Sequence, residues 1–64
     1  MSKDFYREVI KELKALGYSY ADQAKGSHEK WRAPGQQTLI VPRNLDQRHT
    51  ANGILKKSGS TKKF

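Results

Sequence analysis

The chain has 64 residues, enough for one small domain and no second. It contains no cysteine, so neither a disulfide framework nor a thiolate metal site is available, which fits a reducing cytoplasm. No apolar run approaches the roughly 18 residues that cross a bilayer, and the first residues do not resemble a signal peptide. We therefore expect a soluble cytoplasmic protein of modest stability.

The charge is large for this length and unevenly distributed. Thirteen Lys and Arg residues against six Asp and Glu residues give a net charge of +7. Residues 1–24 are neutral overall, whereas residues 25–64 carry the whole excess. A surface evolved only for solubility has little reason for this segregation. The pattern predicts a polyanionic partner for residues 25–64.

The first predicted element is an amphipathic helix over residues 3–16. Charged residues fill one side, and the other side carries Phe5, Tyr6, Val9, Ile10, Leu13 and Leu16. Ser2 is the expected N-cap, Asp4 lies in the first turn, and Gly17 ends the helix.

Three strands and a second helix follow. Residues 18–24, 29–32 and 37–41 read as strands joined by turns at 25–27 and 33–36, with Pro42 ending the third. Apolar spacing then predicts a helix up to Gly59, which either is capped by Asp46 and includes His49 or is shorter and opens at Thr50. We expect a single domain over residues 1–59 and a short, mobile basic tail over 60–64. This order predicts an α+β fold with both helices on one face of a three-stranded antiparallel sheet.

Alternation along the second strand divides its side chains between two faces. Trp31 is the largest apolar side chain in the protein, so we assign Trp31 and Glu29 to the core. His28, Lys30 and Arg32 then point outward together. Core packing is also the default expectation for Tyr18 and Tyr20, with stacking on RNA bases as the alternative for an exposed ring.

His28 is the main candidate for chemistry. The two histidines are too isolated for a structural zinc site, and no glycine-rich phosphate loop is present. RNA carries its own nucleophile, the 2′-hydroxyl, so its cleavage needs a proton-transfer group and positive charge but no metal or cofactor. On the residues alone, however, a solvated or phosphate-binding histidine is the commoner case. His49, near a helix start, is expected to be a neutral surface residue.

Three motifs carry a resemblance to a known family. They are Lys25-Gly26-Ser27-His28-Glu29-Lys30-Trp31-Arg32, Leu39-Ile40-Val41-Pro42, and the segment from Arg48 to Gly59. In this order and spacing, which covers nearly the whole chain, they resemble the HicA family of bacterial toxins. The resemblance implies a double-stranded-RNA-binding-like α-β-β-β-α fold and a metal-independent endoribonuclease that cleaves mRNA, with the family histidine at His28. It also implies a HicB-type antitoxin as partner.

One position departs from that family. Many members have a glycine before the threonine of the last motif, whereas this chain has His49 and carries Gly53 further along. The second helix is therefore expected to begin differently.

The predicted site combines His28 as catalytic residue with a set of RNA-binding residues and no metal. The RNA-binding set is Lys25, Ser27, Lys30, Arg32, Arg43, Lys56 and Lys57. Four lysines most simply complement the C-terminal end of a helix, with contact to the nucleic-acid backbone as the alternative; they are Lys56, Lys57, Lys62 and Lys63. Lys25, Ser27 and Lys30 are candidates for the second proton-transfer group, by proximity in sequence only. Two other readings stay open: a non-catalytic RNA-binding module, and a basic interaction protein for an acidic partner.

Overall fold

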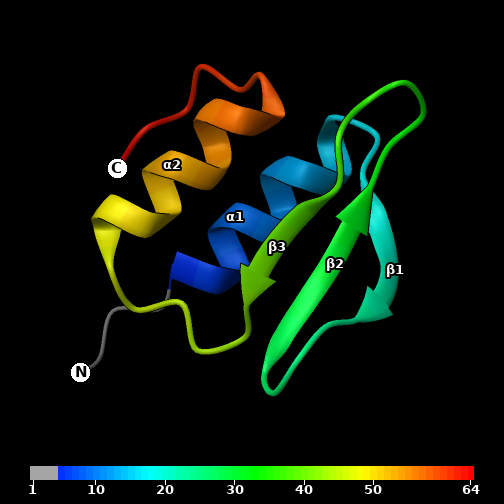
Figure 1. Cartoon of the computed structure of the whole chain (residues 1–64). Coiled ribbons are helices and arrows are strands. Elements are labelled where there is room, and N and C mark those ends of the chain that lie inside the picture. Colours follow the sequence, from blue (N-terminus) through cyan, green and yellow to red (C-terminus); the bar gives the residue numbers. More distant parts are fainter. Residues whose placement is uncertain (1–4) are drawn as a thin grey trace.

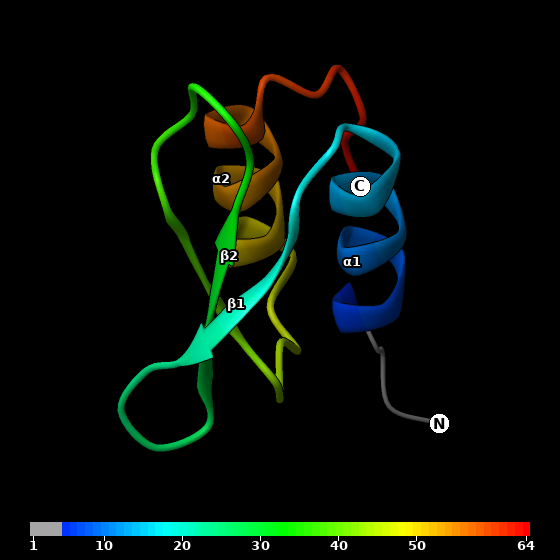
Figure 2. The same ribbon diagram turned by 90° about the vertical axis from the view of Figure 1, so that its right-hand side faces the viewer.

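The computed structural model describes residues 5–64. Its elements are α1 (Phe5–Ala15), β1 (Ser19–Gln23), β2 (His28–Arg32), β3 (Leu39–Pro42) and α2 (Arg48–Ser58), as Figure 1 shows. The strands form one antiparallel sheet in the order β1-β2-β3. Figure 2 shows both helices on the same side of this sheet, which confirms the predicted α-β-β-β-α architecture.

Helix α1 forms where the apolar periodicity predicts it. Val9, Ile10 and Leu13 are buried, since their spacing places them on the side that faces the rest of the protein. Leu16 is the exception: it lies beyond the last helical residue and is 42% exposed. The chain turns at Gly17, as expected. The predicted cap at Ser2 and the acidic Asp4 lie outside the described residues.

The strands match the prediction with small shifts in their ends. β2 begins at His28, and β3 runs one residue further than expected, to include Pro42. Pro42 is tolerated because β3 is an edge strand, where not every backbone N–H needs a partner. Gly35 has a φ of +74° in the turn between β2 and β3, whose Gln36 N–H donates to the carbonyl of Ala33 at 3.1 Å.

Helix α2 begins at neither predicted residue. Its N-cap is Gln47, whose side chain makes no capping hydrogen bond, so the helix includes Arg48 and His49. The predicted helix that includes His49 is confirmed, although its cap is Gln47 instead of Asp46, and the shorter helix opened by Thr50 is wrong. Packing explains the early start, because Ala51, Ile54, Leu55 and Ser58 are buried and hold the helix in place without a side-chain cap.

The core lies between the helix pair and the inner face of the sheet. Trp31 and Tyr18 are buried there with Leu39, Val41 and Leu45, so the predicted face assignment of β2 is confirmed. Tyr20 is different: it is 52% exposed, and its ring meets the edge of Trp31 with 6.0 Å between centroids. The predicted core position of Tyr20 is wrong because β1 is an edge strand that the helices do not cover fully.

Residues 60–64 lie against both helices. Ser60 Oγ donates a 2.6 Å hydrogen bond to Glu12 of α1, and Phe64 N donates at 2.8 Å to Oδ1 of Asn52 of α2. The Phe64 ring meets the ring of Phe5 edge-on, with 4.9 Å between centroids. This segment therefore connects the two helices. No helix within residues 5–64 is long and apolar enough to cross a membrane.

The buried hydroxyl of Tyr18 offers a test of the core. It finds no hydrogen-bond partner within residues 5–64, and a desolvated polar group without a partner costs about 1–3 kcal/mol. We expect Tyr18→Phe to leave the free energy of unfolding unchanged or to raise it by about 1 kcal/mol, measured by urea denaturation. A clear loss of stability would mean that the hydroxyl is bonded in solution.

Candidate functional site

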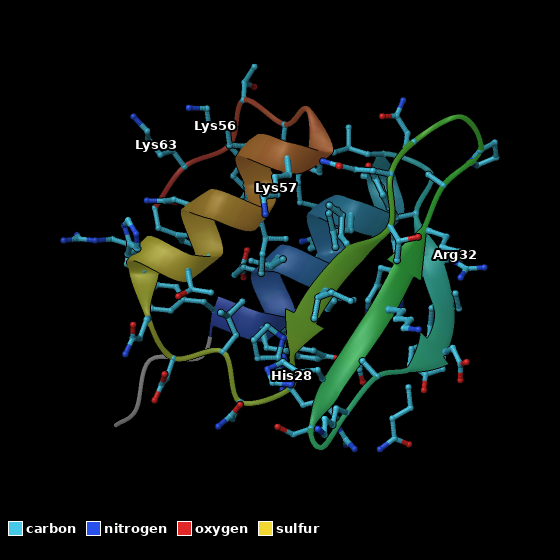
Figure 3. The ribbon with its side chains drawn as sticks, viewed as in Figure 1. His28, Arg32, Lys56, Lys57 and Lys63 are labelled. Carbon is cyan, nitrogen blue, oxygen red and sulfur yellow. The ribbon has the colours of Figure 1, made fainter. Side chains whose placement is uncertain are left out.

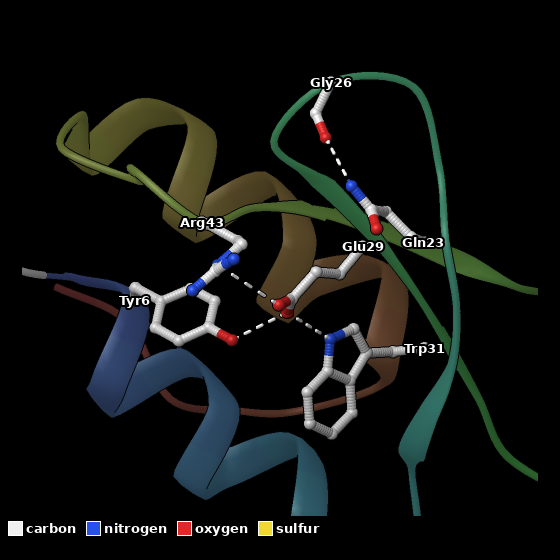
Figure 4. Close-up of polar contacts among 6 residues, drawn as sticks. All are labelled: Tyr6, Gln23, Gly26, Glu29, Trp31 and Arg43. Atoms are coloured by element: carbon white, nitrogen blue, oxygen red, sulfur yellow. Dashed lines mark hydrogen bonds and ion pairs between the residues drawn. The ribbon is translucent and has the colours of Figure 1, made fainter.

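A tight turn between β1 and β2 presents His28. The N–H of His28 donates to the carbonyl of Lys25 at 3.2 Å, and the N–H of Ala24 donates to the carbonyl of His28 at 2.8 Å. Gly26 has a φ of +64°, which residues with a side chain rarely adopt. Gln23 Nε2 donates to the Gly26 carbonyl at 3.0 Å and closes the turn from the other side (Figure 4). His28 is thus held on a defined backbone.

The ring of His28 is oriented by the same turn. Its Nδ1 lies 3.0 Å from the carbonyl oxygen of Lys25, although the ring itself is exposed. A carbonyl oxygen can only accept, so this hydrogen bond requires the proton of a neutral imidazole on Nδ1. Nε2 then carries the free lone pair. In this tautomer, His28 offers its basic nitrogen to a ligand on the solvent side.

Arg43 and Ser27 lie at the same end of the sheet as His28. Pro42 pairs with His28 across β2 and β3, and the N–H of Arg43 donates to the carbonyl of Ser27 at 2.9 Å. The first motif, Lys25–Arg32, and the end of the second, Leu39–Pro42, are therefore joined through the backbone here. The sheet brings together Lys25, Ser27, His28 and Arg43.

A buried carboxylate supports this end of the sheet. Glu29 is only 8% exposed, and its Oε1 accepts hydrogen bonds from the hydroxyl of Tyr6 at 2.6 Å and from Nε1 of Trp31 at 3.0 Å. Its Oε2 lies 3.6 Å from Nε of Arg43. Figure 4 shows these groups converging on the carboxylate from α1, β2 and the segment after β3.

Sequence reasoning placed Glu29 in the core but did not recognise its role. A carboxylate on a buried face needs hydrogen-bond donors or a cation nearby, since burying an unpaired charge is costly. That rule was the available signal. It could not identify the donors, because Tyr6 and Arg43 lie 23 and 14 residues away in the chain.

The remaining predicted residues do not converge on His28. Lys30 and Arg32 share its outward face, but Arg32 lies at the opposite end of β2, about 13 Å along the strand. Figure 3 shows His28 and Arg32 at these two ends and the labelled lysines on and beyond α2. Lys57 lies beside β3, where it lines a shallow hollow with Ile40. Lys56 belongs to a different hollow, against residues 60–63.

Most cations of the described chain are free of carboxylate partners. Within residues 5–64, ion pairs form only between Arg43 and Glu29 and between Lys62 and Glu8. Residues 5–64 also contain no cluster of three or more His, Cys, Asp or Glu side chains that could hold a metal ion. The outward face of the sheet consequently carries the unpaired cations Lys30 and Arg32 and one oriented imidazole, with Asp22 of β1 in register with Lys30.

The fold and the charge define the chain as a small basic α-β-β-β-α domain. The particular family follows from comparison. Residues 6–60 match the sequence model of a family described as "HicA toxin of bacterial toxin-antitoxin". The chain therefore belongs to the HicA family of toxins from bacterial toxin-antitoxin systems. Comparisons with curated proteins and with solved structures give no match.

The Tyr6–Glu29 contact predicts a dependence of stability on alkaline pH. Burial, with the hydrogen bond to Glu29 and its negative charge, raises the pKa of Tyr6 from 10.0 to about 12. Between these values the unfolded chain loses the phenolic proton and the folded chain keeps it. The stabilisation is thus complete below pH 10 and is lost as the pH rises toward 12.

This dependence is measurable by titrating tyrosinate absorbance and by following unfolding at alkaline pH. Tyr6→Phe should remove the last ionisation step and flatten the loss of stability in this range. Tyr20→Phe, which replaces an exposed tyrosine, is the control and should leave that step in place. A late step that persists in Tyr6→Phe would contradict the assignment.

Proposed function

We propose that this HicA-family toxin is a metal-independent endoribonuclease that cleaves mRNA in the cytoplasm, with His28 in proton transfer. The oriented ring of His28, with Nδ1 held by the Lys25 carbonyl and Nε2 free, carries this proposal. A base that is fixed in one tautomer and exposed to solvent suits proton abstraction from a substrate hydroxyl. Family membership adds that the protein acts as a toxin.

The proposed step uses the nucleophile that RNA supplies. Nε2 of His28 takes the proton of a 2′-hydroxyl, and the 2′-oxygen forms a bond to the adjacent phosphorus. The bond from phosphorus to the 5′-oxygen breaks, and the 5′-oxygen leaves with a proton. The products are a 2′,3′-cyclic phosphate and a 5′-hydroxyl. No metal enters this scheme, because the nucleophile is already part of the substrate and lies next to the phosphorus.

Cations near His28 would stabilise the negative charge that develops on the phosphate. Lys25 belongs to the turn that holds the ring, and Lys30 lies two residues from His28 on the same face of β2. Arg43 follows Pro42, the residue paired with His28. The uncharged Ser27 lies in the same turn as Lys25. Lys25, Ser27 and Lys30 are the candidates for protonating the leaving 5′-oxygen. Arg32, Lys56 and Lys57 lie farther away and would bind the RNA backbone.

The partner in this proposal is a HicB-type antitoxin that covers the outward face of the sheet. Figure 2 shows that neither helix lies on that face. Lys30 there pairs across the strands with Ile40, which is 45% exposed. An antitoxin that presents acidic residues around an apolar contact would complement this surface and exclude RNA from His28.

The test of the proposed reaction is RNA cleavage in excess EDTA, comparing the unmodified protein with His28→Ala. A general base contributes about 10²–10⁴-fold in rate, so we expect cleavage by His28→Ala to fall by at least about 100-fold. RNA binding should fall far less. Gln37→Ala, an exposed change in the loop before β3, is the matched control and should cleave normally.

The outcomes separate the competing functions. Equal cleavage by both proteins would remove His28 from the mechanism. Salt-sensitive RNA binding by the unmodified protein without any cleavage would identify a non-catalytic RNA-binding module. Binding to the antitoxin with neither binding nor cleavage of RNA would identify an interaction protein.

Arg43 provides a second test, because its position depends on Glu29. An arginine that stabilises transition-state charge contributes about 10²–10³-fold in rate when well positioned. We expect Arg43→Ala to lower the cleavage rate by about that factor, and Glu29→Gln to lower it less. The double variant should cleave no more slowly than Arg43→Ala, since both changes disturb the same group. Strictly multiplicative effects would show that the two residues act independently.

A further inference from the structure

A hollow on the side of α2 away from the sheet lies apart from His28. Its volume is about 480 Å³, and it is formed by one side of α2 and the segment that follows it. The lining residues are His49, Asn52, Gly53, Lys56, Ser60, Thr61, Lys62 and Lys63. None of them is a large apolar or aromatic residue. The hollow thus lacks the apolar anchor that protein interfaces usually place at their centre.

Residues 60–64, which form one side of this hollow, are bonded to both helices. Asn52 accepts from the backbone N–H of Phe64 at 2.8 Å, and Ser60 donates to Glu12 at 2.6 Å. Lys62 lies 4.0 Å from a carboxylate oxygen of Glu8 and 5.7 Å from the centre of the Phe64 ring. These contacts hold residues 60–64 beside α2, so the hollow belongs to the folded structure.

Lys56 and Lys63 take no part in the contacts that hold residues 60–64 against the helices. Both side chains are exposed, and neither forms an ion pair with a carboxylate within the described part of the chain. Figure 3 shows them extending from the end of the molecule opposite His28. Two unpaired cations that line one hollow favour an anionic ligand, because the ligand relieves their mutual repulsion.

The floor of the hollow allows a polymer to approach the helix. Gly53 has no side chain, and a Cβ placed there would meet no atom within 4 Å. A sugar or phosphate could therefore come close to the backbone of α2. A glycine within a helix costs about 1 kcal/mol relative to alanine, and neither the core nor the turns of this fold require it. A ligand that approaches the backbone of α2 here would give this glycine a role.

We propose that this hollow binds the phosphodiester backbone of an RNA strand, as a second site remote from His28. The proposal rests on the proposed function for its role, since a strand held here would be the toxin's RNA substrate. Lys56 and Lys63 contact phosphates. Lys63 is kept beside α2 by the hydrogen bonds that residues 60–64 form with the two helices. A strand long enough to reach both sites binds more tightly than one that occupies the His28 site alone.

The experiment measures binding of a labelled oligouridylate of about 20 nucleotides, by fluorescence anisotropy. The His28→Ala chain is the background, so that cleavage does not interfere. Lys56→Ala/Lys63→Ala is compared with Lys11→Ala/Lys14→Ala, which removes the same charge from exposed positions of α1 that line a different hollow, one that also contains Tyr6 and Ile10. Affinity for single strands varies with salt to a power of about −0.7 per phosphate contact, so each lost contact costs about fivefold at 0.1 M salt.

We expect Lys56→Ala/Lys63→Ala to weaken binding about 25-fold at 0.1 M salt and to flatten the salt dependence. The α1 pair should change binding less than about threefold. An oligouridylate of about four nucleotides is too short to reach both sites. It should bind the Lys56→Ala/Lys63→Ala and Lys11→Ala/Lys14→Ala variants with equal affinity.

Other results overturn the inference. Equal weakening by both pairs would mean general attraction by net charge, and no weakening would exclude contact with Lys56 and Lys63. Loss of antitoxin binding with RNA binding intact would make the hollow a protein contact. Because cleavage is not read out, failure of the proposed reaction and failure of this second site are distinguishable.

Discussion

The buried carboxylate of Glu29 is the constraint on which the rest of the structure depends. It is compensated by the hydroxyl of Tyr6, the indole of Trp31 and the guanidinium of Arg43, which come from α1, β2 and the segment after β3. Without these donors its burial would cost several kcal/mol. Since successive side chains of a strand point to opposite faces, fixing Glu29 inward also fixes its neighbour His28 outward. One core interaction thereby decides which side of the sheet carries the proposed chemistry.

The charge distribution has a matching structural logic. Residues 25–64 carry the whole net charge of +7. Within residues 5–64, Arg43 and Lys62 are the only cations that form ion pairs with carboxylates. The unpaired cations repel one another, so any polyanion that binds the folded protein also stabilises it. An RNA substrate and an acidic antitoxin would both have this effect. Competition between the two for one positive surface is a simple physical basis for neutralising a toxin of this family.

Much of the fold could be predicted from the sequence because each element has a strong local pattern. The spacing of Val9, Ile10 and Leu13 predicted α1, and the alternation around Trp31 predicted the faces of β2, as the structure confirms. Predictions were wrong where the outcome depends on neighbouring elements. Tyr20 is exposed because it lies on an edge strand, and α2 starts at Arg48 because its packing makes a side-chain cap unnecessary. The Glu29 network was missed for the same reason, since two of its three partners, Tyr6 and Arg43, are distant in the chain.

The sequence by itself determined the order of the elements, the inward position of Trp31 and Glu29, and the presence of His28 within a motif that resembles the HicA family. These features depend on residue type and periodicity, which local geometry dictates. Only the tertiary structure decided that Arg43 lies at the same end of the sheet as His28 and that Lys56 and Lys63 line a separate hollow. Each of these arises from a contact between segments whose approach depends on how the whole chain packs.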